Sequence, residues 1–148
     1  MSEVVLEAEN LVKHYPIKAG ILRRTVGTVK AVDGVSFALH KGETLGIVGE
    51  SGCGKSSLGR LLMRLEEPTS GRLTFDGIDM YSQNGADMRR LRRDIQIVYQ
   101  DPFSSLDPRQ KVQDIIREPL DIHEIGTAEE RRARVTQLLE REIGRAHV

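Results

Sequence analysis

The chain has little cysteine, no excess charge of either sign and no long apolar run. One cysteine in 148 residues rules out an internal disulfide and agrees with a reducing cytoplasm. Lysine plus arginine and aspartate plus glutamate both number 22, so no net basic field indicates a nucleic-acid partner. No apolar run approaches the ~18 residues that cross a bilayer, and residues 1–4 do not resemble the start of a signal peptide. With 39% hydrophobic and 30% charged residues, we expect a cytoplasmic globular protein long enough for one domain.

What the chain does have is a glycine-rich loop at residues 49–56. The loop reads Gly-Glu-Ser-Gly-Cys-Gly-Lys-Ser and matches G-x-x-x-x-G-K-[ST] at every fixed position. The apolar segment 44–48 before it is of strand type. After it, leucines 58, 61, 62 and 65 share one face of a helix. A glycine loop between a strand and a helix is the context in which this motif binds phosphate groups.

Each part of the loop has a task in binding a nucleoside triphosphate. The three glycines let the backbone wrap with its N–H groups pointing inward, and the following helix N-terminus adds unpaired amides and partial positive charge. Lys55 is expected to reach the β- and γ-phosphates, and the Ser56 hydroxyl to complete a Mg²⁺ shell. The alternative is a glycine-rich turn that happens to precede Lys-Ser. The residues expected to contact nucleotide are Gly49, Glu50, Ser51, Gly52, Cys53, Gly54, Lys55 and Ser56.

The rest of the chain mixes strands and helices. We expect a strand from Val4 to Lys13 ended by His14-Tyr15-Pro16, an exposed loop over 17–28, and a second strand at 35–39. Later elements are a hairpin at 73–78, a basic helix at 86–93, a strand at 95–99, a helix from 112 that Pro119 closes, and a helix opened by a capping box at 127–130. This is an α/β architecture of the P-loop kind, with the phosphate loop following a buried strand. The basic run at 89–93 is interpreted as a solvated helix face, because it lacks the interleaved aromatics of a nucleic-acid patch.

Several motifs occur in a characteristic order along this chain. They are an aromatic at Tyr15, Ala-Val-Asp-Gly-Val-Ser-Phe at 31–37, Lys-Gly-Glu-Thr at 41–44, the loop at 49–56, Glu-Pro-Thr-Ser-Gly at 67–71 and Ile-Val-Tyr-Gln-Asp-Pro at 97–102. The whole resembles the ATP-binding subunits of ABC transporters. Within them, the insertion at 16–30 and the run at 103–109 resemble the subunits of bacterial oligopeptide and dipeptide importers. The resemblance covers nearly everything from Leu6 to Arg141, and it implies an ABC-type nucleotide-binding domain with an N-terminal antiparallel β portion.

The resemblance implies roles for three further residues. Tyr15 matches the aromatic that stacks on adenine, a contact of ~1–3 kcal/mol that does not read the base edge; the alternative is an ordinary tyrosine at a strand end. Ser57 matches a position that meets the α-phosphate. Gln100 matches the glutamine that meets Mg²⁺ or the attacking water, which a neutral amide can do without adding charge. Lys55 and Gln100 are therefore the expected catalytic residues, and Ser56 and Gln100 the expected metal contacts.

The resemblance also implies cofactors, partners and a location. The implied cofactors are ATP and Mg²⁺. The implied partners are a membrane permease and a second ATP-binding subunit of the same or a different kind, with no nucleic acid. The implied location is the cytoplasmic face of the inner membrane. The sequence contains no Leu-Ser-Gly-Gly-Gln signature, no apolar strand ending in the Asp-Glu pair of a Walker B motif, and no later switch histidine. The chain is thus expected to bind ATP without useful hydrolysis.

Other functions remain open at this point. One is a soluble ABC protein or another P-loop ATPase not tied to transport, and another is a nucleotide-binding fragment without catalysis. A P-loop GTPase or small-molecule kinase is a further possibility. Asn10 and Asn84 are the only asparagines, and neither fits the Asn-Lys-x-Asp motif that reads guanine.

The last residues, 142–148, depart from the family pattern. They read Glu-Ile-Gly-Arg-Ala-His-Val, where the family continues with an apolar residue, glycine and leucine. Their codons can spell a common sequencing-library adapter read in frame. We therefore expect 142–148 to be a non-native tail and 1–141 to be the N-terminal part of the nucleotide-binding domain. The alternative is a genuine frayed helix end.

Overall fold

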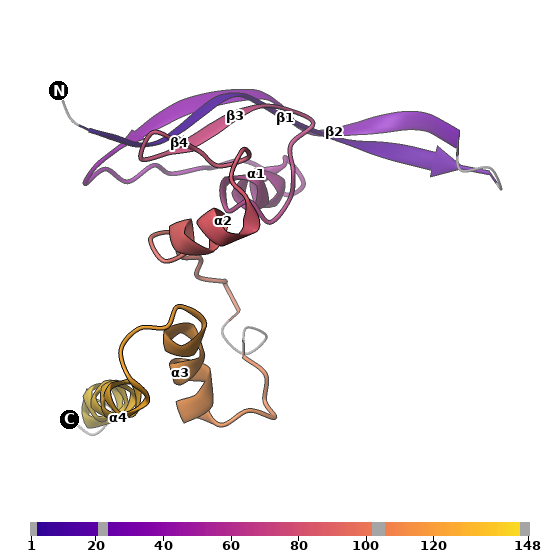
Figure 1. Ribbon diagram of the computed structural model, residues 1–148. Coiled ribbons are helices and arrows are strands. Elements are labelled where there is room, and N and C mark those ends of the chain that lie inside the picture. Colours follow the sequence, from indigo (N-terminus) through magenta and orange to yellow (C-terminus); the bar gives the residue numbers. More distant parts are fainter. Residues whose placement is uncertain (1–2, 21–23, 102–105, 146–148) are drawn as a thin grey trace. The chain divides into compact units, whose positions relative to one another are not determined.

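The structure is a computed structural model that describes residues 3–20, 24–101 and 106–145 (Figure 1). The chain divides into two compact units, residues 1–88 and 89–148, and each is described by itself. The first unit is built on an antiparallel sheet with the strand order β2-β1-β3-β4. Its strands are β1 (Val4–Ala19), β2 (Arg24–His40), β3 (Ser70–Phe75) and β4 (Ile78–Asp79).

Strands β1 and β2 form one long ribbon, the indigo and violet hairpin of Figure 1. The predicted strands at its base are confirmed, but the predicted end at His14-Tyr15-Pro16 is wrong. Tyr15 pairs with Val29 and Pro16 with Thr28, so most of the expected loop at 17–28 is strand. Strand β3 pairs with β1 only as far as Val12, opposite Ser70. At Pro16, β2 is therefore the one described neighbour of β1, and the other edge of β1 has no described partner. Proline, which has no backbone N–H, is tolerated at such an unpaired edge.

Helix α1 (Lys55–Leu62) packs its apolar face against the sheet. Leu58 and Leu61 are buried, and they form the core of this unit with Leu11 of β1 and Val32 of β2. Burying a leucine contributes about 1.5–3 kcal/mol, so this cluster fixes the helix, and with it the loop that precedes it. The predicted helix is confirmed, although Leu65 lies beyond its end and is 50% exposed.

The predicted hairpin after α1 is confirmed. Strands β3 and β4 are joined by Asp76 and Gly77, whose φ angles are 47° and 75°. Two successive positive φ angles match the twist of the flanking strands, and Asp-Gly is a favoured pair for such a turn.

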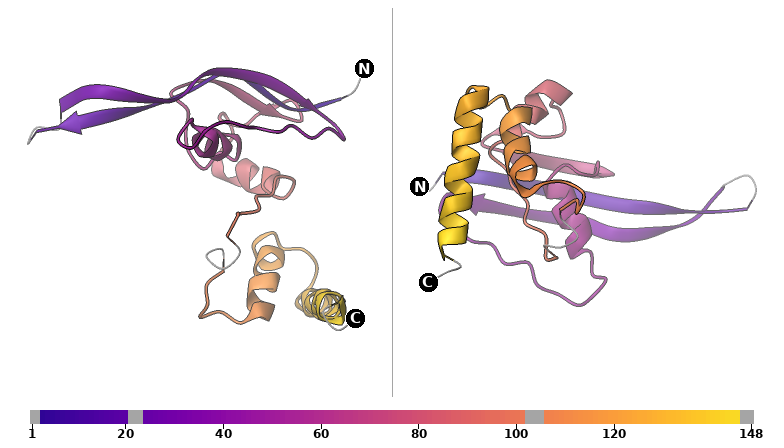
Figure 2. Two further views of the ribbon diagram at one scale, coloured as in Figure 1. Left: turned by 180° about the vertical axis from the view of Figure 1, so that it is seen from behind. Right: turned by 90° about the horizontal axis from the view of Figure 1, so that it is seen from below.

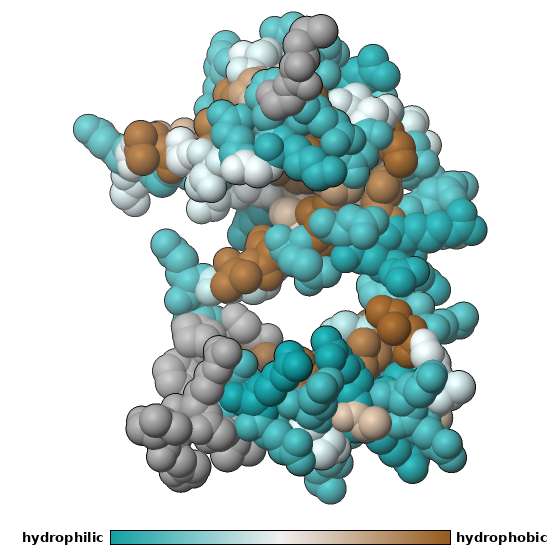
Figure 3. All heavy atoms as spheres, turned by 90° about the vertical axis from the view of Figure 1, so that its left-hand side faces the viewer, coloured by the Kyte–Doolittle hydropathy of each residue, from teal (hydrophilic) through white to brown (hydrophobic). Residues whose placement is uncertain are grey.

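Two predicted strands are absent from the described residues. Segments 44–48 and 95–99 have no strand partner there, and apolar side chains in them are exposed: Ile47 is 44%, Val48 92%, Ile97 42% and Val98 94% exposed. Figure 3 shows brown, hydrophobic patches among the teal surface of the molecule. A cavity of about 600 Å³ is lined by segment 45–48, by residues of β2, and by Cys53, Gly54, Lys55 and Leu58. A strand requires a neighbour for its N–H and C=O groups, and the described chain offers none to these segments. The antiparallel N-terminal portion of the predicted α/β fold is confirmed by the sheet of β1 to β4.

In the part of the chain that the structure describes, three helices follow β4. Helix α2 (Gly85–Leu91), predicted as basic, runs across the boundary between the units, and the second unit contains α3 (Val112–Ile122) and α4 (Ala128–Arg145). Figure 2 shows α3 and α4 side by side. Asp121 of α3 joins them, because it accepts a hydrogen bond from Arg131 of α4 at 2.9 Å. Pro119 does not end α3 as predicted, since the helix continues for three residues to Ile122.

The capping box at the start of α4 is confirmed. The N–H of Glu130 donates to Thr127 Oγ1 at 3.2 Å, and the N–H of Thr127 donates to Glu130 Oε2 at 2.7 Å. Val135 is buried on the predicted apolar face. Within the described residues, no helix is both long enough and apolar enough to span a membrane.

Candidate phosphate-binding site

The predicted phosphate loop is a tight turn that leads directly into α1. The N–H of Cys53 donates to the Glu50 carbonyl at 3.3 Å, which closes the turn. Gly54 occupies the N-cap position with φ 96°, and no side chain caps the helix. The first amides of a helix have no partner within the helix. The loop and the start of α1 therefore present backbone donors in the arrangement that favours anions.

Gly54 lies directly against strand β2. A Cβ atom at Gly54 would lie 2.0 Å from the carbonyl oxygen of Ala31, far inside van der Waals contact. Its φ angle is also one that L side chains rarely adopt. Only glycine fits here, so the loop is seated on the backbone of the long ribbon.

The Lys55 ammonium is folded back into the loop. Its Nζ donates to the carbonyl of Gly49 at 2.8 Å and to that of Glu50 at 2.6 Å, and it lies 3.5 Å from Cys53 Sγ. These contacts hold a positive charge at the centre of the turn, and no carboxylate of the described residues is among its hydrogen-bond partners. A charge held in this way attracts phosphate groups, and the ammonium can exchange carbonyl contacts for phosphate contacts.

A cavity of about 440 Å³ brings most of the predicted site residues together. Its lining includes Ser51, Gly52, Gly54, Lys55, Ser56 and Ser57 from the loop and α1, Tyr15 from β1, and Val29, Lys30 and Ala31 from β2. The phosphate loop and the predicted base-stacking tyrosine thus share one cavity. The larger cavity of about 600 Å³ is also lined by Cys53, Gly54 and Lys55 of the loop, but it follows the apolar segment 45–48, and Tyr15 is not among its described lining residues.

Tyr15 is held by residues that the sequence did not single out. Its hydroxyl donates to Glu66 Oε2, and Lys13 Nζ lies 5.1 Å from the centre of its ring. The hydrogen bond to Glu66 raises the pKa of Tyr15, while the Ser57 hydroxyl acts in the opposite direction. The same hydrogen bond lowers the pKa of Glu66. Period-two alternation could have placed Lys13 beside Tyr15, but no local pattern marks Glu66, which follows α1.

Lys30 of β2 also lines the cavity, as part of an ion pair with Asp33. Its Nζ donates to Asp33 Oδ2 at 3.1 Å, and His14 Nε2 lies 2.8 Å from Asp33 Oδ1. The hydrogen bond from Lys30 has the larger effect and that from His14 the smaller, and both lower the pKa of Asp33. The carboxylate therefore stays ionised and fixes the lysine on the ribbon.

Gln100 is not brought into this site by what the structure describes. It is exposed and belongs to the second unit, whereas the loop belongs to the first. Its role therefore stays a prediction. The importer-like run at 103–109 falls partly outside the described residues, which resume at Leu106. In the portions that are described, no group of three acidic, histidine or cysteine side chains could hold a metal ion.

Comparison with known proteins settles the family. A profile described as ABC transporter matches residues 32–146. The chain belongs to the ABC transporter family. The oligopeptide transport ATP-binding protein AppF of Bacillus subtilis is 51% identical over 140 residues, which are 94% of this chain and 43% of that protein. The di/tripeptide transport ATP-binding protein DppF of Pseudomonas aeruginosa is 46% identical over 142 residues, 96% of this chain and 43% of that protein.

Solved ABC structures share the fold. The dimeric cassette MJ0796 bound to ADP and Pi has a TM-score of 0.70 and 26% identity, over 91% of this chain and 56% of that one. A second dimeric structure of MJ0796, described as a bacterial ABC transporter cassette, has a TM-score of 0.71 and 25% identity over the same shares. The chain thus spans less than half of the peptide-transport relatives and just over half of the solved cassette. ATP hydrolysis is the activity of this ABC ATPase family.

Proposed function

We propose that this chain is the nucleotide-binding part of an ATP-binding subunit that energises import of oligopeptides or dipeptides across the inner membrane. One observation carries the proposal: the Lys55 ammonium lies inside the loop, at a cavity that Tyr15 also lines. The lysine supplies charge for the phosphates, and the ring supplies a face for the base. The peptide-transport names of the relatives support the substrate class.

The remaining roles belong to the same proposal. Ser56, in the first turn of α1, contributes its hydroxyl to Mg²⁺, Ser57 meets the α-phosphate, and Gln100 contacts Mg²⁺ or the attacking water. The complete subunit pairs with a second ATP-binding subunit and a membrane permease on the cytoplasmic face. The dimeric state of MJ0796 supports the pairing.

We also propose that this 148-residue chain binds ATP without useful turnover. Phosphoryl transfer needs the γ-phosphate clamped, Mg²⁺ held from a second side and a water aligned. The Asp-Glu pair and the signature that would supply these functions do not occur in its sequence. Losing positioning groups of this kind costs factors of ~10³ or more in rate.

Uptake by the complete transporter tests the proposed function. The gene extended to its natural stop codon is produced with its permease in membrane vesicles, and uptake of a labelled oligopeptide is followed with and without ATP. We expect ATP-dependent uptake that Lys55→Ala abolishes. ATP hydrolysis without peptide uptake would instead favour the soluble or non-transport ATPase. Equal steady-state hydrolysis by the 148-residue chain and the extended protein would contradict the assignment of catalysis to the missing motifs.

A further inference from the structure

Glu66 contacts three side chains beside the nucleotide cavity, although it is not among the residues that line the cavity. Its Oε2 accepts the hydrogen bond from the Tyr15 hydroxyl, and its Oε1 lies 3.3 Å from Arg60 Nη1 of α1. Lys13 Nζ of β1 lies 3.8 Å from Oε2. The Glu66 side chain is only 24% exposed. The carboxylate therefore ties together the strand and the helix on which the cavity is built.

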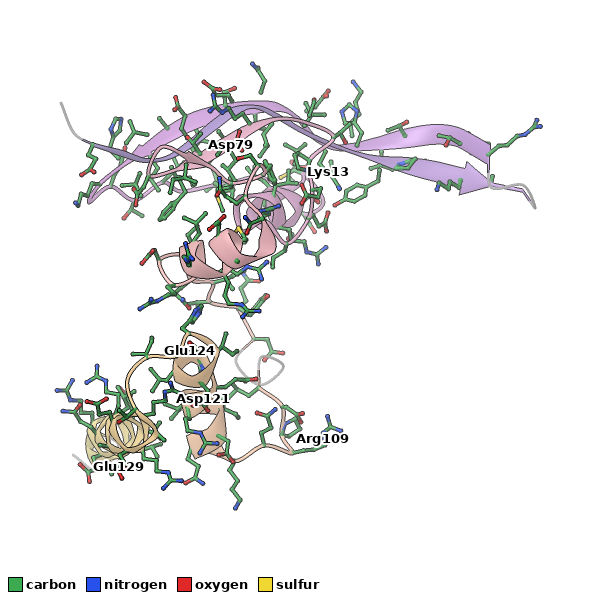
Figure 4. All side chains as sticks on the ribbon, viewed as in Figure 1. Lys13, Asp79, Arg109, Asp121, Glu124 and Glu129 are labelled. Carbon is green, nitrogen blue, oxygen red and sulfur yellow. The ribbon has the colours of Figure 1, made fainter. Side chains whose placement is uncertain are left out.

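Lys13 restrains the same ring from another direction. Its Nζ lies 5.1 Å from the centre of the Tyr15 ring, within the range of a cation–π contact. Lys13 and Tyr15 are two residues apart on β1, so both project from the same face of the sheet. In Figure 4 the labelled Lys13 lies where the ribbon passes α1. Lys13 is itself anchored, because Nζ donates to the Glu67 carbonyl at 2.6 Å.

We propose that Glu66 is a positioning residue that fixes the Tyr15 ring in the cavity wall as a stacking platform for a nucleoside base. This inference rests on the proposed nucleotide-binding function. A ring that is held before the ligand arrives loses less conformational freedom on binding, which corresponds to roughly three- to tenfold in affinity. Arg60 and Lys13 in turn hold the carboxylate in place.

The contributions of the base-binding end and the phosphate-binding end of the site to affinity can be measured separately. ATP uses both ends, whereas inorganic tripolyphosphate uses only the phosphate loop. Both ligands are titrated with Mg²⁺ into the 148-residue chain and into Glu66→Ala, Tyr15→Phe and the double variant. Tyr15→Phe keeps the ring, removes the hydroxyl and leaves the net charge unchanged. Glu67→Ala is the matched control, since it removes the same charge one residue later from a side chain that is 68% exposed.

We expect Glu66→Ala and Tyr15→Phe each to weaken ATP binding about three- to tenfold. The double variant should be no weaker than either single variant, because the two changes break one hydrogen bond. Tripolyphosphate affinity should stay within about twofold in all of them, and Glu67→Ala should behave like the unmodified chain.

Other outcomes would overturn the proposal in distinguishable ways. Unchanged ATP affinity in both single variants would mean that the hydrogen bond does not position the ring. Equal weakening of ATP and tripolyphosphate would assign Glu66 a purely structural role. An unmodified chain that binds tripolyphosphate but prefers it to ATP would show that Tyr15 offers the base no platform. Failure of the unmodified chain to bind either ligand would refute the proposed function itself.

Tyrosine ionisation gives a readout without any ligand. Because the Glu66 carboxylate raises the pKa of Tyr15, Glu66→Ala should lower it in an ultraviolet titration. The Tyr15→Phe variant identifies which transition belongs to Tyr15. An unshifted transition in Glu66→Ala would contradict the contact on which the proposal depends.

Discussion

Substituting alanine at Gly54 tests how the phosphate loop is seated. The added Cβ would lie 2.0 Å from the Ala31 carbonyl oxygen, which is backbone and cannot rotate away. Holding a side chain at φ 96° costs roughly 1–2 kcal/mol. Forcing an extra carbon into a filled space costs about 1–3 kcal/mol more. We therefore expect Gly54→Ala to lower the free energy of unfolding by roughly 2–5 kcal/mol, a large part of the ~5–15 kcal/mol typical of a folded protein.

Gly52→Ala is the matched control for this prediction. Gly52 has a similar φ of 82°, but a Cβ there meets nothing within 4 Å. Gly52→Ala should therefore lower the free energy of unfolding only by the cost of holding a side chain at a positive φ, roughly 1–2 kcal/mol. Urea unfolding followed by far-ultraviolet circular dichroism measures both variants against the unmodified chain. Equal losses in the two would refute the close approach of the loop to β2.

Three further predictions concern the start of α4, the acid stability of the second unit and the loop thiol. Thr127→Ala removes the cap of α4 and should lower the free energy of unfolding by about 0.5–2 kcal/mol, whereas Thr136→Ala in the middle of that helix should change it little; urea unfolding measures both. The hydrogen bond from Arg131 lowers the pKa of Asp121 below its usual 3.8, so its stabilisation is complete above that pH and is lost as the pH falls below it. The unfolding midpoint followed from pH 7 to about pH 2, well below the usual 3.8 of this carboxyl, measures this, and Asp121→Asn should flatten the profile. Maleimide on the exposed Cys53 should block binding of a fluorescent ATP analogue by filling the loop, and bound ATP with Mg²⁺ should slow the labelling.

Each of these has a contradicting result. Equal stability of the Thr127 and Thr136 variants would show that the capping hydrogen bonds do not stabilise the protein in solution. An acid profile that Asp121→Asn leaves unchanged would mean that other carboxylates set the stability. A labelled chain that still binds the analogue would place the thiol away from the phosphates.

The loop, α1 and the capping box could be predicted because their determinants are local. Gly54 precedes Lys55, and Thr127 precedes Glu130, within a few residues, and the structure places both motifs as expected. The Asp76-Gly77 turn is equally local, since two positive φ angles in succession suit these two residues.

The errors concern features that depend on distant partners. An apolar run such as 44–48 indicates a strand only where another strand pairs with it, and the described residues contain none for it. Conversely, Pro16 did not end β1, because β2 continues to pair with the strand from one side. The role of Glu66 could not be predicted for the same reason, since its contact with Tyr15 joins residues far apart in the sequence.

The central claim is that the loop binds a nucleoside triphosphate through Lys55, and an equilibrium titration with a fluorescent ATP analogue tests it most directly. Lys55→Ala removes a charge-assisted contact worth about 1.5–3 kcal/mol, so affinity should fall roughly ten- to hundredfold. Lys41→Ala, which removes a lysine whose side chain is 74% exposed, is the control and should bind like the unmodified chain. Competition by ATP and GTP should differ little, because stacking on Tyr15 does not read the base edge. Equal affinity of the Lys55→Ala and unmodified chains would contradict the account.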